Sequence, residues 1–127
     1  MKTHDLNLND TPRATSGPSQ LVLSLFPGIG LLDRGFEHAG FTVVRGPDII
    51  WGGDIRWFHA LPGKFDGMFG GPPCQKFSRA NRKRDIAGGM VLVNEFFRVV
   101  DEGRPRWWLM ENVPGSPDCD GPAGYSV

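Results

Sequence analysis

The strongest constraint on the fold is a short apolar run that ends abruptly in a glycine turn. Residues 21–26 read LVLSLF, a segment with the length and character of a buried parallel strand. The turn PGIG at residues 27–30 breaks the run, and apolar residues at helical spacing follow as far as Gly40, a typical helix C-terminus. A second apolar run occupies residues 41–44. Strand, turn, helix and strand in this order predict a βαβ unit with parallel strands.

The rest of the chain continues this alternation and predicts an open, doubly wound α/β sheet that is mainly parallel. Residues 54–55 suggest a very short third strand, residues 65–69 a fourth and residues 107–110 a fifth. Residues 90–100 predict a helix, because their apolar side chains fall on one face. In sheets of this kind, ligands bind at the carboxyl ends of the strands.

The polar ends of the chain frame one ordered domain. Residues 1–20 have no hydrophobic periodicity and predict a flexible leader. Residues 21–114 carry the strand and helix patterns, and residues 115–127 predict an irregular tail rich in Pro, Gly and Asp. A chain of 127 residues has room for one domain at most.

Composition excludes several classes of partner. The 14 Lys and Arg residues balance 14 Asp and Glu residues, so any DNA-binding surface must be a local patch. No apolar stretch approaches the roughly 18 residues of a membrane span, and the N-terminus has no signal-peptide core. Two cysteines and three histidines without a CxxC pair argue against a metal site or a disulfide framework. We therefore expect a soluble, cytoplasmic protein that binds neither metal nor membrane.

The glycine turn and two aspartates outline a cofactor site. Glycines let the backbone approach a ligand closely and present helix N-terminal amides. The turn is not the dinucleotide fingerprint, because Asp33 stands where GxGxxG requires its third glycine. Asp48 follows the second strand and could accept from ribose hydroxyls, while Asp54 could accept from an exocyclic amine. Each aspartate alone is better explained as a turn or capping residue, but with the turn they predict an adenosine site.

The most informative stretch is GGPPCQ at residues 70–75. Pro72 and Pro73 have φ fixed at about −65°, and they hold Cys74 in a defined place at a strand end. A structural cysteine lies more often inside a strand or helix, so the setting favours a reactive thiolate. A basic loop follows that could lower the pKa of the thiol, although it also fits an ordinary solvated loop; its charged residues are Arg79, Arg82, Lys83 and Arg84.

Glu111 and Asn112 close the last predicted strand, directly after four hydrophobic residues. A carboxylate at the end of a buried strand would be desolvated, and its pKa would rise toward the range useful for proton donation. A glutamate that caps the strand or forms an ion pair would give the same sequence pattern. If the fourth and fifth strands are neighbours, Cys74 and Glu111 emerge side by side.

Three segments, in this order, resemble signature motifs of DNA (cytosine-5-)-methyltransferases. They are LFPGIG at residues 25–30, GPPCQKFS at residues 71–78 and MENV at residues 110–113. The resemblance covers residues 21–114 and corresponds to the N-terminal catalytic portion of the family. It implies a Rossmann-like S-adenosylmethionine-dependent methyltransferase fold, and transfer of a methyl group to C5 of cytosine in double-stranded DNA.

The resemblance also implies residue roles. Cys74 would add to C6 of a cytosine flipped out of the duplex, Glu111 would bond N3 and the exocyclic amine, and Asn112 would support that carboxylate. The implied cofactor residues are Phe26, Pro27, Gly28, Ile29, Gly30, Asp48, Asp54, Ile55 and Pro73. The implied DNA-contacting loop contains Gln75, Ser78, Arg79, Arg82, Lys83 and Arg84.

The family pattern continues beyond what this chain contains. An Arg-x-Arg element, a target-recognition region and a closing cofactor motif do not occur before Val127. We therefore expect a truncated catalytic domain that needs a complementary C-terminal half or self-association. The alternative is a catalytically inactive remnant that binds cofactor, DNA or a partner protein without turnover. Intact Cys74 and Glu111 favour the enzyme, and the lack of a resolving cysteine disfavours a redox protein.

Overall fold

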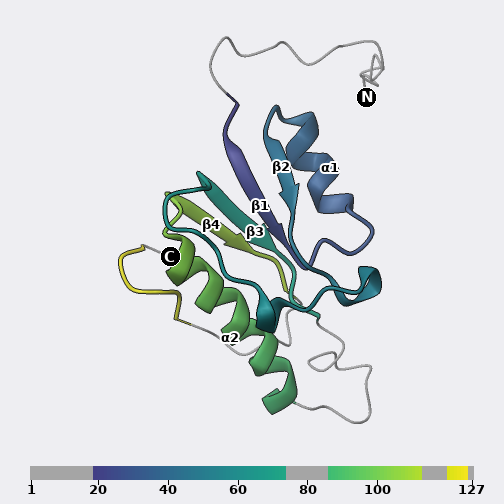
Figure 1. Cartoon of the computed structure of the whole chain (residues 1–127), viewed down its shortest axis with the longest axis vertical. Coiled ribbons are helices and arrows are strands. Elements are labelled where there is room, and N and C mark those ends of the chain that lie inside the picture. The colour runs from purple at the N-terminus through teal and green to yellow at the C-terminus, as the bar shows by residue number, and fades with distance from the viewer. Residues whose placement is uncertain (1–18, 74–85, 113–119, 126–127) are drawn as a thin grey trace, which may run out of the picture.

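The computed structural model describes residues 19–73, 86–112 and 120–125. Four parallel strands form one sheet in the order β2-β1-β3-β4 (Figure 1). The strands are β1 (Leu21–Leu25), β2 (Thr42–Arg45), β3 (Gly67–Gly70) and β4 (Trp107–Met110), and the helices are α1 (Leu31–His38) and α2 (Ile86–Gly103). The predicted parallel α/β architecture is confirmed. None of the described helices is long and apolar enough to cross a membrane.

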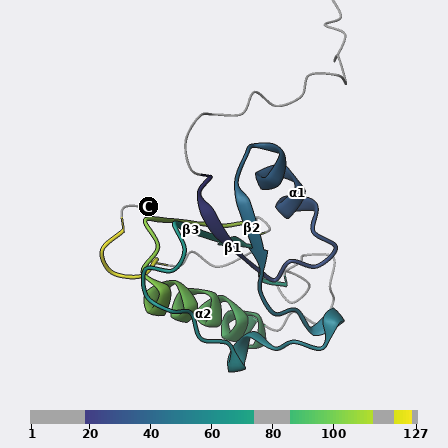
Figure 2. The same cartoon turned by 45° about the horizontal axis from the view of Figure 1, so that its top comes forward.

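The two helices cover opposite faces of the sheet (Figure 2). Successive side chains of a strand point to opposite faces, and β3 uses this alternation directly. Phe69 stacks on Phe36 of α1, with ring centroids 3.9 Å apart. Its neighbour Met68 belongs to the core that Phe96 and Val99 of α2 form on the other face. The sheet is therefore wound on both sides, as the sequence predicts.

Helix α2 extends beyond the predicted residues 90–100 at both ends and supplies much of the core. Its side chains at Val93, Phe96, Val99 and Val100 are fully buried. The helix ends at Gly103, where a Cβ would lie 2.1 Å from the Met68 methyl group. Glycine at this position therefore allows the end of α2 to pack directly on β3.

The predicted third strand at residues 54–55 is wrong. Two short 3₁₀ helices occupy this connection, η1 (Ile49–Trp51) and η2 (Ile55–Trp57). Asp48 accepts a hydrogen bond from the Ile50 amide at 3.0 Å, and Asp54 accepts one from the Arg56 amide at 2.9 Å. Aspartates that bond the backbone two residues ahead favour turns over strands. Within the described residues the sheet therefore has four strands, one fewer than predicted.

The strand order reverses direction between β1 and β3. The chain runs from β1 outward to β2, then returns to place β3 on the other side of β1. Such a switch opens a crevice beyond the carboxyl ends of the two central strands, where doubly wound sheets bind ligands. Here these ends carry residues 26–30 and residues 71–73.

Candidate functional site

The bend at residues 26–30 leaves β1 in an unusual backbone conformation. Phe26, Gly28 and Gly30 all have positive φ, at 55°, 54° and 79°. For a residue with a Cβ this costs about 1–2 kcal/mol, so Phe26 is strained where the glycines are not. The Gly30 amide donates to the Pro27 carbonyl at 2.8 Å and closes the bend. Strained aromatic backbone of this kind clusters at ligand sites.

A small cavity of about 60 Å³ lies on one side of Phe26. Its walls are mostly apolar, with two carboxylates, and they contain five of the nine predicted cofactor residues. The lining residues are Phe26, Pro47, Asp48, Ile49, Asp54, Ile55, Pro73 and Leu92. Mostly apolar walls with two carboxylate acceptors suit a purine with hydroxyl and amine donors. The residues present therefore fit an adenosyl group.

Both carboxylates of this cavity already bond the chain itself. Asp48 accepts from the Gly28 amide at 2.8 Å and so ties the start of η1 to the bend. Asp54 pairs with the Arg56 guanidinium at 2.6 Å, and the hydrogen bonds from Arg56 lower the pKa of Asp54. A carboxylate offers about four lone-pair positions, so Asp48, which accepts two bonds, retains capacity to accept from a ligand. Asp54 already takes four contacts from Arg56, so a ligand donor would have to displace part of that pair.

A second cavity, of about 180 Å³, lies beneath the bend. It joins the carboxyl ends of β1 and β3 to the first residue after β4. The lining residues are Ser24, Leu25, Phe26, Pro27, Ile29, Leu31, Leu32, Asp33, Gly70, Gly71 and Glu111. Phe26 thus forms a wall of both cavities, while Gly28 and Gly30 shape the bend without lining either one.

Glu111 lies beside the strand end that leads to the cysteine motif. Its amide donates to the Gly70 carbonyl at 2.9 Å, and a Cβ on Gly71 would lie 3.0 Å from its Oε2 atom. The prediction that this carboxylate is desolvated is wrong, because Glu111 is exposed. Strand β4 ends at Met110, and the side chain that follows opens onto the cavity and solvent. Asn112, the next residue, is half-buried.

The nucleophile and the basic loop lie outside the described residues. These are Cys74, Gln75, Ser78, Arg79, Arg82, Lys83 and Arg84. Pro73, which precedes them, lines the first cavity, and Gly71 lies against Glu111. The described chain therefore enters the cysteine motif at the crevice between the two central strands. The described residues contain no cluster of three or more His, Cys, Asp or Glu side chains that could hold a metal ion.

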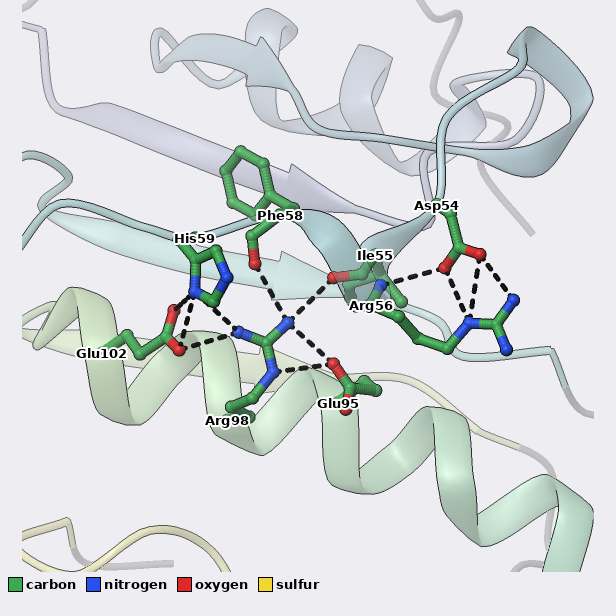
Figure 3. Close-up of polar contacts among 8 residues, drawn as sticks. All are labelled: Asp54, Ile55, Arg56, Phe58, His59, Glu95, Arg98 and Glu102. Carbon is green, nitrogen blue, oxygen red and sulfur yellow. Dashed lines mark hydrogen bonds and ion pairs between the residues drawn. The ribbon is translucent and has the colours of Figure 1, made fainter.

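A half-buried arginine, Arg98, holds the wall that carries Asp54 and Ile55 (Figure 3). Nη2 of Arg98, on α2, donates to the carbonyls of Ile55 at 2.8 Å and Phe58 at 3.0 Å. On its own helix Arg98 pairs with Glu95 at 2.7 Å and with Glu102 at 2.8 Å. Sequence reasoning missed this clamp, because charges at helical spacing usually mark a solvated face.

The titration of the clamp follows from its hydrogen bonds. Burial alone would raise the pKa of Glu102, but the bonds from Arg98 and His59 outweigh it and lower that pKa. Burial would likewise lower the pKa of Arg98, yet the two carboxylates raise it. His59 Nδ1 lies 3.1 Å from Glu102 Oε1 and extends the network toward solvent. Arg98 and Glu102 are therefore both charged near neutral pH.

Comparison with known proteins shows which family this chain belongs to. The family model for C-5 cytosine-specific DNA methylases matches residues 50–118, which include β3, α2, β4 and the segments that follow β3 and β4. The chain belongs to this family. In this methylase chain, the carboxyl ends of the central strands β1 and β3 lead into the segments that line the two cavities.

Several named enzymes are similar to this methylase chain. It is 35% identical to the type II methyltransferase M.NgoPII of Neisseria gonorrhoeae, over 84% of this chain and 36% of that protein. It is 38% identical to M.FnuDI of Fusobacterium nucleatum and 36% identical to M.AquIA of Picosynechococcus, each over 74% of this chain. The chain covers 32% and 48% of those two proteins, so it spans about a third to a half of the length of these relatives.

Proposed function

We propose that this chain takes part in transferring a methyl group from S-adenosylmethionine to C5 of cytosine in DNA. One observation carries the proposal: the bend after β1, the Gly71–Pro73 segment after β3 and Glu111 after β4 line two cavities that share Phe26 as a wall. These are the three segments that resemble the family's motifs. Neither cavity alone would specify this chemistry.

The cavity beside Phe26 is the proposed cofactor site. Phe26, Ile55 and Leu92 would enclose the adenine, and Pro73 would close the slot toward the cysteine. Asp48 would accept from the ribose and Asp54 from the exocyclic amine. Pro27, Gly28, Ile29 and Gly30 would present the bend to the rest of the cofactor. When bound, S-adenosylmethionine supplies an electrophilic methyl group.

The proposed reaction begins with the Cys74 thiolate, which adds to C6 of a flipped cytosine and forms an S–C6 bond. The C5=C6 electron pair moves into the ring, and Glu111 stabilises the product by bonding N3 and the exocyclic amine. C5 is then nucleophilic and would take the methyl group as the methyl–sulfur bond breaks, which leaves S-adenosylhomocysteine. A base removes the C5 proton, the electron pair re-forms C5=C6, and the thiolate leaves. Asn112 would hold the segment that carries Glu111.

DNA would meet the loop that follows Cys74. Gln75 and Ser78 offer polar contacts, and Arg79, Arg82, Lys83 and Arg84 offer charges for phosphates. A thiolate nucleophile also requires a reducing compartment, so we propose that the chain acts in the cytoplasm.

Full activity would also need further polypeptide, from a complementary C-terminal half or a second copy. The relatives are two to three times longer than the part that this chain matches. Large apolar side chains next to the cofactor site are exposed: Ile29, Leu31, Ile49, Ile50 and Trp51. Several large apolar side chains exposed near one site are typical of an interaction surface. We propose that the additional polypeptide covers this rim.

Covalent capture tests the proposed chemistry. The chain would be incubated with S-adenosylmethionine and random-sequence duplex DNA in which 5-fluorocytosine replaces cytosine. One arm would contain the chain alone, and the other would add the part of M.NgoPII that the alignment leaves uncovered. Fluorine at C5 blocks proton removal, so a competent thiolate stays attached to C6. Cys119→Ala is the matched control for Cys74→Ala, since both variants retain one cysteine.

A DNA adduct that persists in Cys119→Ala and disappears in Cys74→Ala supports the enzyme. Calorimetric binding of S-adenosylhomocysteine without an adduct in either arm overturns methyl transfer and leaves a cofactor-binding remnant. Absence of both binding and adduct overturns the whole proposal.

A further inference from the structure

The structure assigns Asp33 and Arg45 as positioning residues that hold the bend in its ligand-ready shape; this inference rests on the proposed function. Asp33 lies in the first turn of α1 and is only 1% exposed. Its Oδ1 atom accepts from the Ser24 hydroxyl on β1, and its Oδ2 atom accepts from Arg45 Nε on β2 at 2.9 Å. Three elements thus meet at one carboxylate.

This connection spans the bend itself. Ser24 and Asp33 are nine residues apart, and residues 26–30 form the loop between them. Fixing both ends of a short loop restricts the conformations open to its middle. Ser24 and Asp33 also line the cavity beneath the bend, so a shift of either one changes the shape of that cavity.

Arg45 adds a steric restraint at Gly30. A Cβ on Gly30 would lie 2.9 Å from Nη2 of Arg45, so the guanidinium lies directly against this glycine. Gly30 therefore meets two requirements, a φ of 79° and contact with a charged group where other residues would have a side chain. The salt bridge to Asp33 holds the guanidinium in this place.

Stability alone does not explain a buried acid here. Leu31 and Leu32 on the same turn are exposed, while Asp33 occupies the buried position. A well-packed apolar residue is often as stabilising as a buried ion pair or more so, because burying charge costs desolvation free energy. Asp33 is buried whereas the Arg45 side chain is 56% exposed, so the carboxylate carries the desolvation cost. Its bonds to β1 and β2 hold the two ends of the bend in one arrangement.

Amide exchange and cofactor affinity together test the inference. The variants are Asp33→Asn and Arg45→Met, with Glu37→Gln as an acid-to-amide control on the exposed side of α1. NMR exchange of the Gly30 amide in the ligand-free chain reports the bend, and exchange of the Phe69 amide in β3 reports global unfolding. Calorimetry measures the affinity of the proposed cofactor site for S-adenosylhomocysteine.

We expect Asp33→Asn to speed exchange at Gly30 and to weaken S-adenosylhomocysteine binding, each by about tenfold, as for loss of one charged hydrogen bond. Exchange at Phe69 should change much less, and Glu37→Gln should resemble the unmodified chain. Arg45→Lys keeps the charge without the planar group and should fall between the unmodified chain and Arg45→Met.

Equal acceleration at Gly30 and Phe69 would overturn the inference, since the carboxylate would then act on global stability alone. If Asp33→Asn does not fold, the comparison of Arg45→Lys with Arg45→Met decides by the same criterion. Failure of the unmodified chain to bind S-adenosylhomocysteine would refute the cofactor site, while the exchange measurement would still decide what Asp33 does to the bend.

Discussion

Replacing Arg98 with methionine tests the clamp that holds the wall of the proposed cofactor cavity. Methionine retains most of the aliphatic volume but removes every donor. The carbonyls of Ile55 and Phe58 then lose their bonds to Nη2, and Glu95 and Glu102 lose their cation. Because Ile55 lines the cavity, the loss should reach the ligand site as well as the fold.

The structure sets the size of this effect. Hydrogen bonds from a charged donor contribute about 1.5–3 kcal/mol each, and the Arg98 side chain is 27% exposed, so we take the lower figure. Two carbonyl bonds then give a loss of about 3 kcal/mol. The two intrahelical ion pairs add less than about 1 kcal/mol. For a domain of this size the melting temperature should fall by roughly 10–20 °C.

Urea unfolding followed by tryptophan fluorescence measures this loss, with Arg104→Met as the control. Arg104 pairs with Asp101 at 3.2 Å, but both side chains are more than half exposed, so its free energy of unfolding should change by less than about 1 kcal/mol. Arg98→Lys should recover part of the loss. A free energy of unfolding in Arg98→Met equal to that of Arg104→Met would refute the clamp.

Three further predictions concern other parts of the chain. Gly30→Ala should lower the free energy of unfolding by about 1–2 kcal/mol because of its positive φ, and unchanged urea unfolding would contradict this. Gly67→Ala should prevent normal folding, because its Cβ would lie 2.2 Å from the Trp107 ring; a native circular dichroism spectrum and melting temperature would contradict this. The folded pKa of Glu102 lies below its ordinary value of 4.5, so its contribution to stability is present above that value and is lost as pH falls through the lowered pKa. The stability difference between the unmodified chain and Glu102→Gln should shrink in urea unfolding as the pH falls from 7 to 3, and a constant difference would argue against the ion pair with Arg98.

The strand-and-helix framework could be predicted because it depends on local patterns. The apolar runs at residues 21–26 and 107–110 became β1 and β4 almost residue for residue. The predicted strand at residues 54–55 failed because a single aspartate redirected the backbone. One hydrogen bond over two residues outweighs the weak strand preference of so short a segment. Short segments are therefore decided by side-chain bonds more than by hydrophobic pattern.

The same limits apply to the predicted site: positions at strand ends could be predicted, whereas exposure and contacts between distant segments could not. Residues named from the motifs do line two adjoining cavities, because the carboxyl ends of parallel strands meet at one edge of the sheet. The exposure of Glu111 was predicted incorrectly, because β4 ends at Met110 and Glu111 is the first residue outside the sheet. The clamp at Arg98 joins α2 to residues about forty positions earlier. No local pattern in the sequence encodes that pairing.

Three aspartates near the bend show what sequence alone leaves open. Asp33, Asp48 and Asp54 each lie close to a turn, and each satisfies a different set of donors. Asp33 meets a hydroxyl and a guanidinium and is buried. Asp48 bonds two backbone amides, Asp54 bonds an amide and the exposed Arg56 guanidinium, and both line the proposed cofactor cavity. Because Asp33 is shielded from solvent, a ligand would reach Asp48 and Asp54 first. The same residue type is therefore predicted to shape the bend at one position and to contact the cofactor at the other two.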